Sequence, residues 1–191
     1  MVLLALDPSF SCTGVSIIDL NNKVITLAEV KCRMGSDFQT SFSNAINITT
    51  RIIKLLKDYE DDLVILSEEP FPGQFTSPGL YQLDSLIFFN LITLKSFNTI
   101  YNIHPNFLKK VHNKKSYHKS ESTELAKEFL DIFLHNDFTC NKTKFNNNVA
   151  EAFIYACKLY CKMSNTNEIT KSLFKIKPCL KDDKEKLLYK K

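Results

Sequence analysis

The chain has 191 residues, of which 44% are hydrophobic and 24% charged, which suits one compact domain with its own core rather than two domains joined by a linker. The opening MVLLALD is too short for a signal peptide and contains Asp7, and no later stretch approaches the roughly 18 apolar residues of a membrane span. We therefore expect a soluble protein of the cytoplasm or nucleoid, or of the host cell cytoplasm for a viral protein, and not a secreted or membrane protein.

The spacing of the cysteines and the local charge indicate what kind of site the protein could contain. The six cysteines are scattered, so we expect reduced thiols rather than a disulfide scaffold. Cys157 and Cys161 lie one helical turn apart and could ligate zinc, but no second ligand pair completes four ligands, which favours helix packing. The net charge of +4 is concentrated in residues 105–119, which contain five lysines and no acid. This segment is either a phosphate-binding surface or a solvated loop.

The first part of the chain predicts three strands. Residues 2–6 form a short apolar run that ends at Asp7, typical of a buried strand whose last residue emerges at the end of a sheet. Residues 9–14 then turn the chain, and residues 15–20 and 24–30 are β-rich runs on either side of a polar turn. Three strands in succession indicate antiparallel pairing.

Helices and strands alternate in the rest of the chain. A helix over residues 42–59 is predicted from apolar residues at helical spacing, namely Phe42, Ile46, Ile53, Leu56 and Tyr59. A buried strand, an apolar helix, a strand and two further helices follow, at 63–66, 80–97, 99–103, 122–134 and 149–163. The order βββαβαβαα predicts an α/β RNase H-like fold, a five-stranded mixed sheet with helices on both faces. We expect residues 1–164 to form this domain and residues 165–191 a basic tail, helical or disordered.

Acidic residues follow two of the predicted strands. Asp7 comes directly after the first strand, Glu68 and Glu69 come directly after strand 63–66, and Glu151 lies in the first turn of the last helix. A single acid in such a place is typically a turn or capping residue, but carboxylates gathered at one sheet edge repel each other unless a cation holds them. The pattern therefore predicts two Mg²⁺ or Mn²⁺ ions bridged by Asp7, with Glu68 and Glu151 on either side, which activate water against a phosphodiester.

Four segments in this order resemble the RuvC-type Holliday junction resolvases of the RNase H-like superfamily. They are residues 4–9 with Thr13-Gly14, residues 68–71, residues 104–109 with the later Lys119, and residues 148–152. They are similar, in turn, to the family's first-strand motif, its Glu-x-x-Phe step, its lysine pair and its closing acidic helix start. The Asn-, Lys- and Ile-rich composition suits a divergent phage or viral member.

The resemblance implies an endodeoxyribonuclease that cuts four-way or other branched DNA junctions by paired, two-metal hydrolysis, as a homodimer. The catalytic residues that it implies are Asp7, Glu68, Glu151 and Lys119. The implied metal ligands are Asp7, Glu68, Asn148 and Glu151. The implied DNA-binding residues are Phe71, Lys109, Lys110, Lys114, Lys115 and Lys119.

Departures from the family pattern leave alternatives open. Asn148 stands where the pattern usually has an acid or a histidine, and the lysine segment lacks the usual glycines. A nuclease for RNA–DNA hybrids or flaps, or a catalytically inactive DNA-binding relative, would have the same fold. Helix residues 85–97 are apolar around nearly the whole circumference, which fits a dimer interface and an intramolecular core helix equally well. Phe71, between two prolines, is predicted to stack on DNA bases from an exposed loop rather than to pack in the core.

Overall fold

A computed structural model describes the chain apart from residues 10, 32–36, 58–61, 70–77, 95–98, 105, 115–117, 143–144, 165–166, 182–185 and 191. Within helices and strands, it does not describe the side chains of residues 78, 79, 92, 94, 119, 142, 186 and 188–190. Among the described residues, no helix combines the length and the apolar character that crossing a membrane requires.

In the part of the chain that the structure describes, seven strands form one mixed sheet. They are β1 (Val2–Asp7), β2 (Cys12–Asp19), β3 (Val24–Lys31), β4 (Leu63–Glu68), β5 (Thr99–Ile103), β6 (Thr139–Lys142) and β7 (Lys186–Lys190). Their order across the sheet is β6-β3-β2-β1-β4-β5-β7. As predicted, β1, β2 and β3 pair antiparallel. Strand β4 then pairs parallel with β1, and β5 pairs parallel with β4. All five predicted strands are therefore present, and the short edge strands β6 and β7 are additions.

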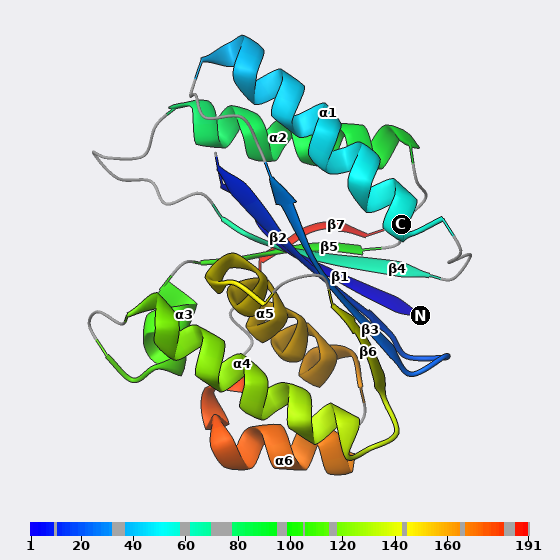
Figure 1. The fold of residues 1–191 in the computed structure, drawn as a ribbon, viewed down its shortest axis with the longest axis vertical. Helices are drawn as coiled ribbons and strands as arrows, with labels where there is room; N and C mark the ends of the chain where they lie inside the picture. The colour runs from blue at the N-terminus through cyan, green and yellow to red at the C-terminus, as the bar shows by residue number, and fades with distance from the viewer. Residues whose placement is uncertain are drawn as a thin grey trace.

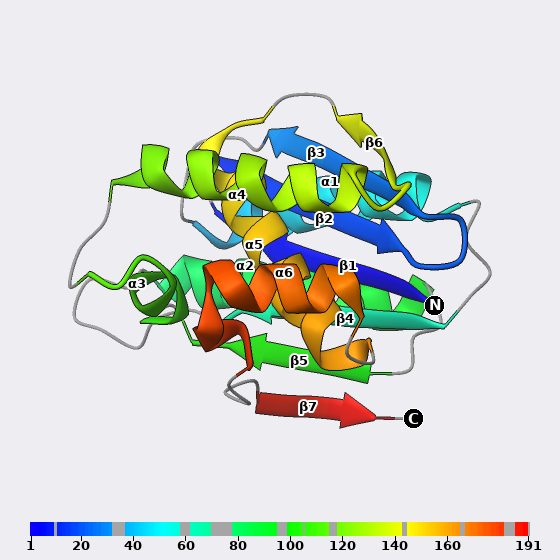
Figure 2. The ribbon, with the colours of Figure 1, turned by 90° about the horizontal axis from the view of Figure 1, so that it is seen from below.

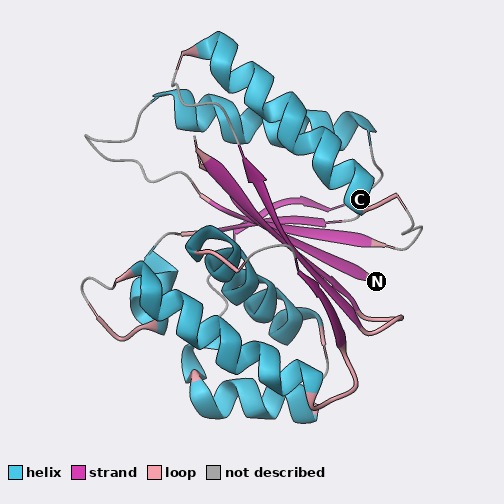
Figure 3. Ribbon diagram, viewed as in Figure 1, coloured by secondary structure: helices cyan, strands magenta, loops and turns pink. Residues whose placement is uncertain are grey.

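Helices cover both faces of the sheet, which gives three layers (Figures 1 and 3). They are α1 (Phe38–Leu55), α2 (Pro78–Leu94), α3 (Asn106–Val111), α4 (Lys119–Leu134), α5 (Asn147–Met163), α6 (Glu168–Ile176) and the 3₁₀ helix η1 (Pro178–Lys181). Helices α1 and α2 lie on one face, and α3, α4, α5 and α6 lie on the other (Figure 1). We call these the α1 face and the α5 face.

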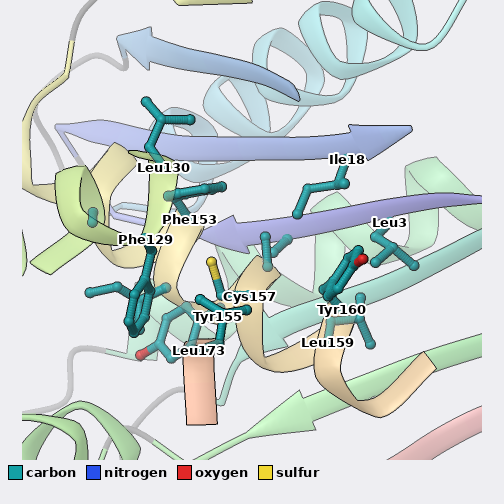
Figure 4. Close-up of a cluster of buried hydrophobic side chains, with 14 of the residues drawn as sticks. Leu3, Ile18, Phe129, Leu130, Phe153, Tyr155, Cys157, Leu159, Tyr160 and Leu173 are labelled. Atoms are coloured by element: carbon teal, nitrogen blue, oxygen red, sulfur yellow. The ribbon is translucent and has the colours of Figure 1, made fainter. Parts of the chain in front are cut away.

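The core on the α5 face is built around α5 itself. Every residue from Val149 to Tyr160 is buried, so this helix lies between the sheet and the helices outside it. Aromatic rings fill the space: Phe133 packs edge-on against Phe138 and Tyr160, with ring centroids 5.1 and 4.9 Å apart. Figure 4 shows part of this buried cluster, with Phe153, Tyr155 and Tyr160 of α5 labelled. These rings pack α5 against α4, while α5 also contacts β1 and β2 of the sheet.

Part of the predicted tail also packs on this core. Residues Glu168–Ile176 form α6, whose first turn is capped because the Asn167 side chain accepts a hydrogen bond from the Thr170 amide. Ile169 and Leu173 of α6 and Leu180 of η1 are buried in the core of the α5 face. Beyond them, β7 pairs antiparallel with β5 at the edge of the sheet.

Helix α1 buries only some of the apolar residues that predicted it. Phe42 and Ile46, two of the apolar residues from which this helix was predicted, are 43% and 45% exposed, although Leu56 just after the helix is fully buried. The buried side of α1 is formed by Ser41, Asn44, Ala45, Ile48, Thr49 and Ile52, and the buried Thr49 hydroxyl donates to the Ala45 carbonyl at 2.7 Å. Large apolar residues therefore lie on both sides of α1, which the periodicity alone does not reveal.

Candidate active site

The first two predicted acids end adjacent parallel strands. The register between β1 and β4 pairs Leu6 with Ser67, so the next residues, Asp7 and Glu68, lie side by side where the two strands end. Neighbouring strands are about 4.8 Å apart, which brings two such carboxylates within reach of one cation. Asp7 is buried and Glu68 is half-buried. The structure therefore brings together the acids that the strand pattern placed at one edge.

Both side chains belong to the α5 face. Alternate residues of a strand point to opposite faces, and Leu3 and Ala5 of β1 lie in the core of the α5 face, as do Val64 and Leu66 of β4. Asp7 and Glu68 continue these two alternations. The neighbouring acid Glu69 lies beyond the end of β4, so this alternation singles out Glu68 rather than Glu69.

Gly14 brings the N-terminus of α5 onto Asp7. Gly14 is the register partner of Asp7 in β2, and a Cβ on it would lie only 2.1 Å from the Asn148 carbonyl oxygen and 2.8 Å from the Val149 nitrogen. Only glycine permits so close an approach of a helix backbone to a strand. The prediction that residues 9–14 form a turn is wrong at its end, because β2 begins at Cys12 and Gly14 lies within the strand.

A network of polar side chains holds the start of α5 against the turn after β1. The Asn148 amide donates to Ser9 Oγ at 3.2 Å and to the Cys12 carbonyl, and the Ser9 hydroxyl accepts from the Cys12 amide at 3.1 Å. Asn146 caps the helix, since its side chain accepts from the Val149 amide at 2.9 Å. The Asn148 nitrogen therefore has a structural function, and only its Oδ1 atom could serve as the predicted metal ligand.

Glu151 lies one turn along α5 from Asn148 and is 4% exposed. The buried Ser122 hydroxyl, from α4, donates to Glu151 Oε1 at 3.4 Å, and His112 Nε2 lies 3.0 Å from Ser122 Oγ. Burial lowers the pKa of His112, the nearby Lys177 and Lys114 lower it further, and Glu121 opposes them. A neutral His112 that donates from Nε2 completes a chain of donors that ends on Glu151.

The donor chemistry of this edge suits a hard cation. Asp7, Glu68 and Glu151 offer only carboxylate oxygens, the ligands that Mg²⁺ and Mn²⁺ prefer. In the described part of the chain, however, no three His, Cys, Asp or Glu side chains gather closely enough to form a ready set of ligands. The sheet register thus places Asp7 and Glu68 side by side, whereas the Glu151 side chain accepts a hydrogen bond from Ser122.

A further acid lies behind Glu68, on the α1 face. Asp84 of α2 is 7% exposed, and its Oδ1 accepts a hydrogen bond from Ser67 Oγ at 3.3 Å. Burial raises the pKa of Asp84 to about 7; the Ser67 hydrogen bond opposes this rise and the negative charge of Glu68 adds to it. Asp84 was not predictable from the sequence, because nothing in the apolar helix pattern marks an inward-facing acid.

This buried acid predicts a pH-dependent stability. The folded-state pKa of about 7 exceeds the ordinary value of 3.8, so the contribution of Asp84 to stability is fully present below pH 3.8 and is lost as the pH rises to about 7. Asp84→Asn keeps the uncharged form at every pH. We expect the variant to match the wild type at pH 4 and to exceed its free energy of unfolding at pH 8 by up to about 4 kcal/mol in urea titrations.

Asp19→Asn is the matched control for this experiment. Asp19 is also buried, but its carboxylate accepts hydrogen bonds from the Asn21 and Asn22 amides at 2.9 and 3.1 Å. Its replacement should lower the free energy of unfolding at pH 8. If Asp84→Asn also destabilises the protein at pH 8, a charged Asp84 has favourable partners and burial does not raise its pKa as stated.

The structure describes only some of the predicted DNA-binding residues. Lys109 and Lys110 at the end of α3 are exposed and, together with Asn106, Asn113 and Lys114, line a shallow groove of about 500 Å³. Lys114 Nζ lies 2.7 Å from Glu121 Oε2, so one acid partly neutralises this group. Lys119 is the first residue of α4, but its side chain is outside the described part of the structure. Phe71 and Lys115 lie outside the described residues altogether.

No protein-family model and no curated protein matches the sequence. Among solved structures, the fold is similar to that of Thermus thermophilus RuvC, with a TM-score of 0.56 and 15% identity over 85% of this chain and 96% of that chain. T. thermophilus RuvC in complex with a Holliday junction substrate gives a TM-score of 0.56 and 14% identity over 86% of this chain and 97% of that chain.

The yeast mitochondrial Holliday junction resolvase Ydc2 has the same arrangement, with a TM-score of 0.50 and 10% identity over 94% of this chain and 80% of that chain. At such low identities the similarity concerns the fold. The α/β, RNase H-like fold class predicted from the sequence is confirmed, in the form found in RuvC-type resolvases, with seven strands among the described residues where five were predicted.

Proposed function

We propose that this protein is a metal-dependent, structure-selective endonuclease that resolves four-way or other branched DNA junctions by paired phosphodiester hydrolysis. One observation carries the proposal. Asp7 and Glu68 end adjacent parallel strands on the α5 face, and the first turn of α5 packs on Gly14, the register partner of Asp7. We propose that Glu151, one turn further along α5, is the third acid of the site, in a fold similar to that of Thermus thermophilus RuvC.

The proposed cofactors are two Mg²⁺ or Mn²⁺ ions, held by Asp7, Glu68 and Glu151 and by the Asn148 Oδ1 atom. Such ions activate water and stabilise the leaving oxygen in phosphodiester hydrolysis. The protein positions the carboxylates through the sheet register and through the buried Ser122 donor. Lys119, at the start of α4, would face the phosphate that is cut.

Surface chemistry supports a branched DNA substrate and a dimer. Lys109 and Lys110 present positive charge beside β5, as backbone contacts to DNA require, and Phe71 would stack on unpaired bases at the junction centre. For the homodimer, the outer surface of the α1 face carries exposed rings: Phe38 is 62% and Phe89 is 65% exposed. A second copy covering these rings would place two sites for paired cuts.

A catalytically inactive DNA-binding relative is the second candidate. It is favoured by the Asn148 amide, which is committed to Ser9 and Cys12, and by the side-chain directions, which form no three-ligand cluster among the described residues. The two proposals are distinguished by incubating the protein and Mg²⁺ with a synthetic four-way junction, a linear duplex and an RNA–DNA hybrid. Cutting of the junction alone supports the resolvase, cutting of the hybrid supports a ribonuclease, and binding without cutting supports the inactive relative.

The Ser122 donor should tune the metal site. Ser122→Ala removes the hydrogen bond that directs Glu151 Oε1, and removal of such a supporting hydrogen bond typically costs about tenfold to a hundredfold in metal affinity or activity. We expect the Mg²⁺ concentration for half-maximal cleavage to rise by about tenfold, with a smaller change at saturating Mg²⁺. Ser120→Ala, at an exposed position of the same helix, is the control and should leave the Mg²⁺ dependence unchanged. An unchanged Mg²⁺ dependence in Ser122→Ala would mean that Glu151 needs no help from α4.

The lysines should contribute unequally to DNA binding. Removing one lysine that binds a DNA phosphate lowers the slope of log K against log salt concentration by roughly one. We expect this reduction for Lys109→Ala and Lys119→Ala, and a smaller one for Lys114→Ala, because Glu121 already partners Lys114. Fluorescence anisotropy of a labelled junction at several salt concentrations, with Ca²⁺ in place of Mg²⁺, measures the slopes. Equal slopes for the wild type and all three variants would mean that these lysines do not bind DNA phosphates and that residues 105–119 form a solvated surface.

A further inference from the structure

His112 lies between the lysine-bearing helix α3 and the candidate active site. Its amide donates to the Leu108 carbonyl at 2.9 Å, so His112 continues α3 by one residue. Phe107 of α3 packs on the Tyr155 ring, with ring centroids 6.1 Å apart, and Tyr155 lies one turn beyond Glu151 on α5. Figures 1 and 2 both show α3 at the end of the molecule where α4 and α5 begin. The packing of α3 on α5 therefore holds the backbone of His112 beside the candidate active site.

Ser122 connects the His112 imidazole to the Glu151 carboxylate. Ser122 Oγ lies 3.0 Å from His112 Nε2 and 3.4 Å from Glu151 Oε1. Ser122 is fully buried and Glu151 is 4% exposed, so bulk water does not compete for the hydroxyl. A serine hydroxyl has one hydrogen to donate and lone pairs that accept. Ser122 therefore donates to only one of these two neighbours at a time.

The charge of Glu151 decides which neighbour receives the Ser122 hydrogen. A carboxylate that binds a cation is ionised, and an ionised carboxylate only accepts hydrogen bonds. If Ser122 donated to His112, the lone pairs of its oxygen would face the Glu151 carboxylate in a buried place, which is unfavourable. The hydroxyl hydrogen therefore belongs on the Glu151 side, and His112 Nε2 must carry a hydrogen and donate to Ser122.

Burial keeps the His112 ring uncharged near neutral pH. Burial lowers the pKa of His112, the charges of Lys177 and Lys114 lower it further, and Glu121 raises it. A neutral imidazole has one ring hydrogen, on either Nδ1 or Nε2. The hydrogen bond to Ser122 selects the form with the hydrogen on Nε2, so that the ring orients the hydroxyl without a buried charge.

We propose that His112 is a positioning residue of the carboxylate site, which holds the Ser122 hydroxyl in the orientation that directs its hydrogen to Glu151. The inference rests on the proposed metal-dependent nuclease function, because it takes Glu151 as an ionised metal ligand. Partners that orient a metal ligand typically change metal affinity or activity by about tenfold to a hundredfold when they are removed. His112 acts through Ser122 rather than on the metal itself.

Nitrogen NMR of the histidine rings tests the predicted tautomer. The chain has four histidines, so the ring signals of His112 are identified by their absence from the spectrum of His112→Gln. With saturating Mg²⁺ near pH 8, we expect a neutral ring with its hydrogen on Nε2. A neutral ring with its hydrogen on Nδ1 would overturn the proposal, because Ser122 would then donate to His112 and not to Glu151.

Metal affinity in the absence of DNA tests the role of this ring. Calorimetric titration with Mn²⁺ measures binding, and the part that disappears in Asp7→Asn is assigned to the carboxylate site. His112→Leu should weaken this binding by about tenfold. His112→Gln, whose side-chain amide can still donate to Ser122, should retain most of the affinity. His135→Leu replaces an exposed histidine at the end of α4 and is the control, with the affinity of the wild type.

A double-mutant cycle shows whether His112 acts through Ser122. Ser122→Ala and the double variant His112→Leu/Ser122→Ala should both bind Mn²⁺ about tenfold more weakly than the wild type, since the two residues support the same contact. The proposal is overturned if His112→Leu binds Mn²⁺ like the wild type, if His112→Gln loses as much affinity as His112→Leu, or if the two losses multiply to about a hundredfold. A wild type without Mn²⁺ binding that depends on Asp7 contradicts the nuclease proposal as well, so the two failures are recognised separately.

Discussion

Asp7→Asn, Glu68→Gln and Glu151→Gln are each expected to lower junction cleavage in Mg²⁺ by on the order of a thousandfold, the equivalent of roughly 4 kcal/mol of transition-state stabilisation. Each change removes one negative charge from the edge where β1, β4 and α5 meet, and none removes a positive charge that would contact DNA. Junction affinity, measured in Ca²⁺, should therefore remain close to that of the wild type.

Glu69→Gln is the matched control, because it removes a neighbouring charge that lies beyond the end of β4. Cleavage by this variant should stay within a few fold of the wild type. If a variant of Asp7, Glu68 or Glu151 cuts at nearly the wild-type rate, the residue that it replaces is not part of the site. If Glu68→Gln is active and Glu69→Gln is not, Glu69 takes the role assigned to Glu68.

Gly14→Ala should inactivate the protein without touching any acid. The new Cβ would meet the Asn148 carbonyl oxygen at 2.1 Å, and since both atoms belong to backbones held by a sheet and a helix, the start of α5 must shift. Such overpacking typically costs about 1 to 3 kcal/mol of stability. We expect a lower Tm. At temperatures where the variant is fully folded, we still expect cleavage to be lost, because Glu151 moves with α5.

Ser16→Ala provides the comparison on the same strand. Ser16 lies two residues along β2 and so on the same face, it is fully buried, and its hydroxyl has no hydrogen-bond partner among the described residues. Its truncation should leave Tm and cleavage unchanged or slightly raise Tm. Normal cleavage by Gly14→Ala would show that the position of α5 on β2 does not determine the geometry of the site.

The central strands and the acids at their ends were predictable from the sequence. β1 is entirely buried and reads as an unbroken apolar run, so its end at Asp7 is marked by the first charge. Strand β4 ends at Glu68 in the same way. Because parallel strands end at the same edge, two local patterns were enough to bring these acids together, although they are 61 residues apart in the sequence.

The edges of the sheet could not be predicted in this way. β6 has the sequence TCNK and β7 has KLLYK, and neither shows the alternation of a strand with one buried face. Edge strands commonly carry lysine and polar residues, which protect them from pairing with other chains. Their pairing with β3 and β5 is set by the tertiary structure, so local sequence carries little trace of it.

The supporting residues of the site were missed for a related reason. Ser122 and Asp84 are polar residues within helices, and by sequence alone such residues are expected on the solvent side. Only the packing shows that Ser122 points to Glu151 and that Asp84 points to Ser67. Gly14 was noticed as part of a turn, whereas the signal that matters is its position opposite Asp7, which requires the strand register.

A crystal of the protein soaked in Mn²⁺ tests the carboxylate site most directly, because anomalous scattering locates the metal without reference to activity. We expect anomalous peaks within coordination distance, about 2.0 to 2.2 Å, of oxygens from Asp7, Glu68 and Glu151, and no such peaks in the Asp7→Asn variant. Mn²⁺ bound elsewhere, or no peak at this edge at saturating Mn²⁺, would contradict the assignment of these three residues as a metal centre.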